Sequence, residues 1–127
     1  MRTDKIQFGR RGEDAAVSFL EKHGYKILER NFRNRLGEID IIARDGRTIC
    51  FIEVKARSTR DRGSPLEAIT PLKQHKLSQM ALFYLKQKSL TNAPARFDVI
   101  SIQLDPQGHQ AVSLLKNAFD LSRTYSY

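Results

Sequence analysis

The chain has 127 residues, with 22 Lys and Arg against 14 Asp and Glu, and a formal net charge of +8. No run approaches the ~18 apolar residues that a membrane-spanning helix needs, and a single cysteine excludes a zinc site built on cysteine pairs. The basic excess favours a polyanionic partner such as nucleic acid, and the lone Cys50 with no recognisable signal peptide predicts a cytoplasmic protein.

The first predicted element is a helix, within a single domain that covers residues 1–127. Residues 1–7 are polar enough to form a loose tail. From Arg11 to His23, apolar residues recur at helical spacing, and Gly24 follows where a glycine often ends a helix. We therefore expect a tail and then a helix that ends before Gly24.

Three strands are predicted next. The first covers Tyr25–Arg33 and has a basic outer half, and the second and third cover Gly37–Arg44 and Thr48–Arg57. Asp45-Gly46 separates the last two, and this dipeptide between apolar runs is a strong signal for a tight hairpin. The polar stretch that follows, residues 58–65, predicts an exposed and mobile loop.

A second helix and two strands complete the predicted order. Pro71 lies near the start of the helix, and Ala95–Leu104 forms the fourth strand. Ala111–Phe119 is predicted as a fifth strand, with a short helix as the alternative. The order α, β, β, β, α, β, β indicates an α/β fold with one mixed sheet flanked by helices.

The Asp-Gly loop also predicts how the second and third strands pair. If the loop is these two residues alone, Asp40 lies opposite Phe51 and diagonal to Glu53, while Glu38 directly faces Glu53. Diagonal neighbours are close enough for both carboxylates to reach one ion. Two glutamates that face each other repel unless a positive charge intervenes, and Lys55 or a divalent cation would supply it.

Alternation along the strands sorts the side chains onto two faces. Lys55 shares the face of Asp40 and Glu53. Charges gathered beside apolar residues are atypical of a solvated face, so we favour a metal site over a salt-bridge cluster. The opposite face is predicted to be apolar, with Ile39, Ile41, Ala43, a buried and unreactive Cys50, Ile52 and Val54.

The predicted site has the chemistry that Mg²⁺ or Mn²⁺ prefers. Carboxylates without His or Cys partners suit these hard cations better than zinc, and no histidine of this chain lies in a metal-binding spacing. A cation held by Asp40 and Glu53 can polarise a phosphoryl oxygen and activate water, which fits phosphodiester hydrolysis. Lys55 then acts as a base or, as we prefer, stabilises charge on the phosphate.

Asp40, Glu53 and Lys55 match the D…(D/E)xK signature of restriction-endonuclease-like nucleases. The wider set GRRGEDAA, GYKILERNFR, GEIDIIARD and CFIEVKAR closely resembles the YraN-like family of predicted endonucleases, uncharacterised protein family 0102, from about Gly9 to Phe119. The resemblance implies a restriction-endonuclease-like core, a Mg²⁺ or Mn²⁺ cofactor, and these three residues as the catalytic set. The similar archaeal Holliday-junction resolvases place a glutamate on the first helix near the metal carboxylates, and Glu13 matches it as a catalytic and metal-binding position.

Two glutamates have open alternatives. Glu13 is either such a ligand or an acidic residue that stabilises the first helical turn. Glu38 is either a further metal ligand or the ion-pair partner of Arg35 or Arg57.

A basic surface is predicted around this site. Phosphate contacts hold and orient nucleic acid without reading its bases, and no sequence-reading motif is recognisable. The alternative is a solvated surface that keeps the protein soluble. The candidate phosphate-binding residues are Arg10, Arg11, Arg33, Arg35, Arg57, Arg60, Arg62, Lys73 and Lys76.

The sequence thus predicts a Mg²⁺-dependent endonuclease that hydrolyses DNA phosphodiester bonds, with selectivity for DNA structure left open and branched or duplex DNA as its partner. One alternative is a catalytically silent nucleic-acid-binding module with the same fold. Another is a nuclease subunit that is active only with a partner protein. A symmetric homodimer would suit four-way DNA.

Overall fold

The computed structural model describes residues 2–58 and 69–120, with side chains described from Gly9 onward. This part of the protein contains two helices and one five-stranded sheet. Neither of these described helices is long and apolar enough to cross a membrane. In chain order the elements are α1 (Arg2–Lys22), β1 (Lys26–Asn34), β2 (Gly37–Asp45), β3 (Thr48–Ser58), α2 (Pro71–Gln87), β4 (Ala95–Leu104) and β5 (Gln110–Phe119).

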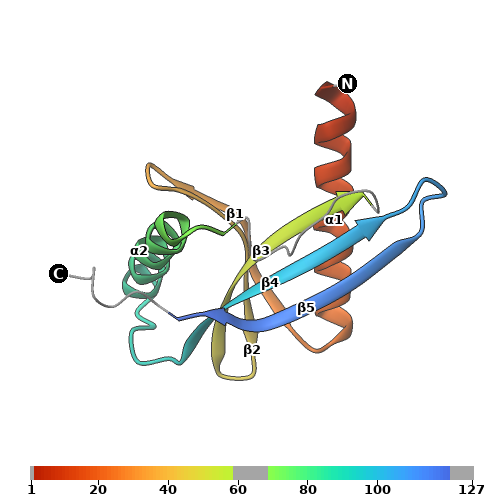
Figure 1. The fold of residues 1–127 in the computed structure, drawn as a ribbon. Helices are drawn as coiled ribbons and strands as arrows, with labels where there is room; N and C mark the ends of the chain where they lie inside the picture. Colours follow the sequence, from red (N-terminus) through yellow and green to blue (C-terminus); the bar gives the residue numbers. More distant parts are fainter. Residues whose placement is uncertain (1, 59–68, 121–127) are drawn as a thin grey trace.

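The strands form one mixed sheet in the order β1-β2-β3-β4-β5 (Figure 1). β1, β2 and β3 are antiparallel neighbours, β3 and β4 are parallel, and β4 and β5 are antiparallel. A parallel pair needs a crossover connection, and α2 lies in the one between β3 and β4. The predicted α/β fold with one mixed sheet is therefore confirmed, and it is consistent with a restriction-endonuclease-like core.

The two helices cover opposite faces of the sheet. This follows from β3, whose successive side chains point to opposite faces and pack in two different apolar clusters. Phe51 packs in the cluster of Met80 from α2, whereas the next residue, Ile52, packs in the cluster of Leu20 from α1. Cys50 is fully buried on the α1 side. Burial raises the pKa of its thiol to about 12, as expected for an unreactive cysteine.

The start of the first helix differs from the prediction. α1 begins at Arg2, so residues 2–7, predicted as a loose tail, are helical. This stretch is polar but contains no proline, and Arg, Lys and Gln are good helix formers. The predicted fifth strand is confirmed: β5 is a strand throughout Gln110–Phe119, and the short-helix alternative is wrong. The predicted mobile loop at residues 58–65 lies outside the described residues, apart from Ser58 at the end of β3.

The predicted pairing of β2 with β3 is wrong by two residues. Ile42, not Asp40, lies opposite Phe51, and the loop is Gly46-Arg47. Gly46 has a φ of 61°, which suits the first position of a two-residue hairpin loop. Because side chains alternate with a period of two, a shift of two residues does not by itself move a side chain to the other face.

Ile39 is on the other face from the one predicted. It packs with Ile42 in the α2-side cluster, whereas Ile41 lies in the α1-side cluster. Near Ile39, β2 pairs with β1 and no longer with β3, and two-stranded ribbons twist strongly. In Figure 1 this end of the β1–β2 hairpin curls toward α2, which carries Ile39 to that side.

A charged network joins the turn end of β2 to β4. Arg96 donates from Nη2 to Asp45 at 2.9 Å and to the Tyr25 hydroxyl at 2.8 Å, and from Nε to Asp98 at 3.0 Å. Asp98 is buried and also accepts from the backbone N–H of Asn117 in β5. The sequence analysis missed this network and assigned Asp45 to a loop, because the partners are far apart in the chain.

Candidate active site

The candidate site lies where β2 and β3 separate. Ile41 and Ile52 are the last pair of their ladder, and Asp40 and Glu53 are the next residues on the two strands. The backbone N–H of Val54 donates to Asp40 Oδ2 at 2.8 Å, so a carboxylate takes the place of a ladder carbonyl. The separation of the strands therefore positions two carboxylates close enough to repel each other.

The surroundings of Asp40 oppose its ionisation. Burial and the negative charge of Glu53 raise the pKa of Asp40 to about 7, although the N–H of Val54 favours the carboxylate. The charges of Glu38 and Glu13 raise it further. Carboxylates packed so closely that the pKa of one is raised strongly are typical of functional sites, because a bound cation relieves their repulsion.

Glu53 and Lys55 lie on the α2 side of β3. Glu53 is buried, and Nζ of Lys73 in α2 is 3.1 Å from its Oε2. Burial, followed by the positive charge of Lys73, lowers the pKa of Lys55, whereas Glu53 and Asp40 act in the opposite direction. The structure thus brings Asp40, Glu53 and Lys55 together and adds a second lysine.

α1 carries Glu13 to the same carboxylates. Among the described residues its buried Oε1 has no hydrogen-bond partner, and it forms an ion pair with Arg30 of β1, 3.6 Å from Nη2. The preceding residue, Gly12, lets α1 lie directly on Ala56 of β3. A Cβ on Gly12 would lie only 2.6 Å from Ala56 Cβ, so the missing side chain is required for this packing.

Gly12→Ala should therefore destabilise the fold by roughly 1–3 kcal/mol, since overpacking outweighs the helix-propensity gain. Gly9→Ala is the matched control on the same helix: among the described residues no atom lies within 4 Å of a Cβ added at Gly9, so it should be stabilising by ~0.5–1 kcal/mol. Urea unfolding measures both changes. Ala56→Gly should restore stability to the Gly12→Ala chain, and equal stability of the two alanine variants would contradict this packing.

The other residues predicted for the site differ in their position relative to Asp40, Glu53 and Lys55. Glu38 lies opposite Arg33 in the β1–β2 pairing, with an oxygen 3.4 Å from Arg33 Nε, a partner that the sequence analysis did not consider. Arg35 is exposed in the turn of that hairpin, and Arg57 is half-buried near the end of β3. Arg10 on α1 and Lys76 on α2 are exposed, and Arg60 and Arg62 lie outside the described residues.

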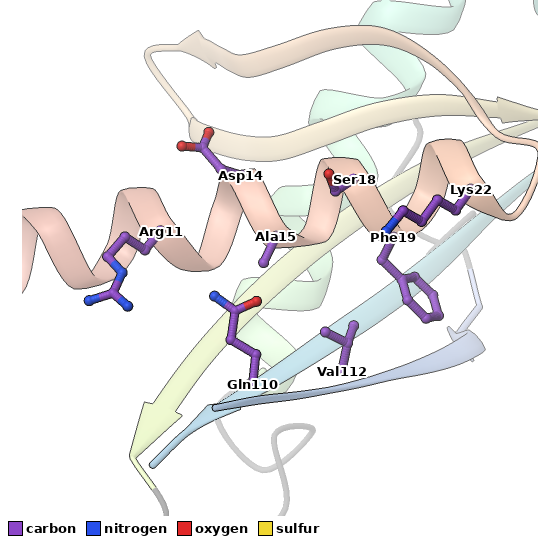
Figure 2. A pocket seen from close by; sticks show the side chains of 8 residues that line it. All are labelled: Arg11, Asp14, Ala15, Ser18, Phe19, Lys22, Gln110 and Val112. Atoms are coloured by element: carbon purple, nitrogen blue, oxygen red, sulfur yellow. The ribbon is translucent and has the colours of Figure 1, made fainter. Parts of the chain in front are cut away.

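Arg11 is not brought to the carboxylates. It lines an open groove of about 520 Å³ between α1 and β5. In Figure 2 Arg11 projects from the side of α1 on which Gln110 of β5 lies, whereas the side chain of Asp14 projects from the opposite side. Asp14 pairs with Arg30 of β1 at 2.8 Å, and Arg30 is also the neighbour of Glu13. Arg11 and Glu13 therefore lie on different sides of the helix.

The site offers a partial ligand set for a hard divalent cation. Within residues 2–58 and 69–120, no three Asp, Glu, His or Cys side chains are grouped as ready metal ligands. Mg²⁺ is often held by one or two carboxylates, with water and phosphate oxygens completing its shell. Asp40 and Glu53 meet this requirement. Near them lies the buried Oε1 of Glu13, which is paired with Arg30 at 3.6 Å and accepts no hydrogen bond from the described part of the chain. The residues present therefore fit Mg²⁺ or Mn²⁺.

The sequence predicts Lys73 only as part of the phosphate-binding surface and does not indicate its contact with Glu53. Burial lowers the pKa of Lys73, but the charge and hydrogen bond of Glu53, with smaller contributions from Lys55 and Asp40, together raise it. No local pattern indicates this contact, because it depends on how α2 packs back on β3. Arg30 was likewise not recognised as the neighbour of Glu13.

The profile of uncharacterised protein family UPF0102 matches residues 12–102 of the sequence. The chain belongs to this family. A UPF0102 protein of Geobacter metallireducens is 52% identical over 114 residues, which cover 90% of this chain and 93% of the relative. A UPF0102 protein of Syntrophus aciditrophicus is 48% identical over 120 residues, 94% of each chain. The resemblance noted from the sequence is confirmed, and the UPF0102 match spans every residue of the candidate site.

Proposed function

We propose that the protein is a Mg²⁺-dependent endonuclease that hydrolyses DNA phosphodiester bonds. The observation that carries this proposal is the grouping of Asp40, Glu53 and Lys55 where β2 and β3 separate. Phosphodiester hydrolysis requires an activated water and stabilisation of negative charge, and carboxylates that bind a cation beside an amine suit both needs. The net charge of +8 favours a polyanionic substrate.

In this proposal Asp40 and Glu53 hold the cation, which polarises a phosphoryl oxygen and acidifies water when it is bound. Lys55 stabilises the negative charge that develops on the phosphate. Nζ of Lys73, 3.1 Å from Oε2 of Glu53, offsets the carboxylate charge. Its ammonium group adds a second positive side chain, beside Lys55, near the incoming phosphate. Glu13 contributes an oxygen from α1, as its buried Oε1 suggests.

The second candidate function is a catalytically silent nucleic-acid-binding module. The Lys73–Glu53 ion pair favours it, because an internal ammonium already neutralises the buried glutamate. In such a module the basic residues contact phosphate and no cation is needed. The two functions differ in divalent-metal binding and in cleavage.

Incubation with linear, nicked, flapped and four-way DNA, and with RNA, in Mg²⁺, Mn²⁺ or EDTA tests the proposal. We expect DNA cleavage that depends on Mg²⁺ or Mn²⁺ and stops in EDTA. Calorimetric titration of the same protein reports metal binding independently. The silent module is the better description if no cation binds at millimolar concentration with DNA present and no substrate is cut. Cleavage that appears only after a cell extract is added identifies a partner-dependent nuclease.

DNA binding should also weaken as salt rises, with a log–log slope near −0.9 for each phosphate contact. Lys76 is exposed on α2 and borders the site beside Glu38, so Lys76→Ala should make this slope shallower by about 0.9. Lys86→Ala, in the last turn of the same helix, is the matched control and should leave the slope unchanged. Fluorescence anisotropy at several salt concentrations measures the slopes. The same slope for all three proteins would assign Lys76 to solubility.

A further inference from the structure

A small pocket opens beside the candidate site, between the β1–β2 turn and α2. Its volume is about 190 Å³. The wall is mainly apolar: Leu36 at the turn is 38% exposed and therefore reachable, while Leu77 and Met80 are buried beneath it. Three charged residues, Glu38, Lys73 and Lys76, also line the pocket.

Lys73 connects this pocket to the proposed catalytic carboxylates. This lysine lines the pocket and has its Nζ 3.1 Å from Oε2 of Glu53. Glu38, which also lines the pocket, is one of the charges that act on Asp40. A ligand in the pocket is therefore next to the phosphate that the proposed nuclease would cut.

We infer that this pocket receives the base of an unpaired nucleotide adjacent to the cleaved phosphate, so that the substrate is DNA with a base outside the helical stack. The inference rests on the proposed function. A nucleotide combines an apolar base face with an anionic phosphate, which complements an apolar wall edged by Lys73 and Lys76. A base within a duplex is stacked and paired, and an unpaired base costs least to move into a side pocket. The flexible thioether of Met80 suits bases of different shape.

The test measures DNA binding with the full chain carrying Asp40→Asn, so that no strand is cut. Three DNAs are compared: a duplex, the same duplex with one extra unpaired adenine, and that DNA with an abasic residue in place of the adenine. We expect the adenine-containing DNA to bind about tenfold more tightly than the other two, as for a filled apolar pocket. Leu36→Ala should reduce its affinity to that of the abasic DNA and leave the abasic DNA unaffected.

The Leu36→Ala chain should fold normally. The hydrogen bond in the turn runs from the backbone N–H of residue 36 to Asn34 Oδ1 at 2.8 Å, and alanine keeps this N–H. Leu115→Ala, an equally conservative change at a 47% exposed leucine of β5, is the control and should bind all three DNAs like the parent.

Equal affinity of the Asp40→Asn chain for the adenine and abasic DNAs overturns the inference. So does a result in which Leu36→Ala lowers the affinity for both DNAs by the same factor. If Leu36→Ala leaves DNA binding intact but turns a dimer into a monomer in light scattering, the pocket holds a second copy of the chain and the inference is wrong. Failure to bind any of the DNAs overturns the proposed function as well, so the two failures are distinguishable.

Discussion

Asp40→Asn should abolish metal-dependent cleavage and leave the fold intact. The amide oxygen can still accept the backbone N–H of Val54, which is 2.8 Å from Oδ2 in the native chain. The lost charge belongs to one of the two carboxylates proposed to hold the cation. We expect Mn²⁺ affinity to fall by at least about tenfold and cleavage by at least about 10²-fold. Calorimetry and a cleavage assay measure these changes, and metal-free DNA binding should persist or tighten.

Asp120→Asn is the control for this experiment. Asp120 is an exposed carboxylate that follows β5 and lies outside the group around Asp40, so its loss should change neither metal affinity nor cleavage. Cleavage by Asp40→Asn at the rate of the native chain would remove Asp40 from the proposed mechanism.

The same variant should alter how stability depends on pH in EDTA. Burial and Glu53 raise the pKa of Asp40 to about 7, above the ordinary aspartate value expected in the unfolded chain. The folded protein therefore binds this proton more tightly, and the resulting stabilisation is complete below about pH 4 and is lost as pH rises through about 7. Asp40→Asn should be more stable than the native chain at about pH 8, with a smaller difference at about pH 5. Urea unfolding that shows the same difference at both pH values would contradict this expectation.

Lys55→Ala should separate cleavage from metal binding. Both carboxylates proposed to hold the cation remain, so Mn²⁺ affinity should be retained or rise slightly because a neighbouring positive charge is lost. Cleavage should fall by about 10²–10³-fold, the usual effect of removing one group that stabilises transition-state charge. Single-turnover cleavage and calorimetry on the same preparation measure both quantities.

Lys55→Arg tests which role the lysine has. Arginine keeps the positive charge but does not act as a base, because its guanidinium stays protonated. Substantial activity in Lys55→Arg supports charge stabilisation, whereas loss in both variants supports the base. If Lys55→Ala cleaves DNA at the native rate, Lys55 has neither role.

The order of strands and helices was predictable because local signals agree with the fold. β4 covers Ala95–Leu104 as predicted, and α2 begins at Pro71, with Thr70 as its N-cap. Alternation along β3 correctly separated the side chains of Glu53 and Lys55 from those of Ile52 and Val54. These features depend on spacing alone, which a sequence displays directly.

The predictions fail where contacts between residues far apart in the chain determine the local structure. Asp45 resembles a loop residue, but its salt bridge to Arg96 keeps it in β2 and moves the loop to Gly46-Arg47. Ile39 changes face because the β1–β2 ribbon leaves β3 and bends toward α2. Lys73 reaches Glu53 only through the packing of α2 on the sheet. None of these contacts has a signature within a short window of sequence.

The two ends of the β2–β3 pair differ in mechanical stiffness. At the turn end, Arg96 joins Asp45 to β4 through charge-assisted hydrogen bonds, which are the stronger kind. At the other end, the N–H of Val54 is held by the side chain of Asp40 and not by a neighbouring strand's carbonyl. Because the β2–β3 ladder has already ended there, we expect small deformations of the sheet to concentrate at this end. Such movement would adjust the spacing of the carboxylates while the Arg96 network holds the other end.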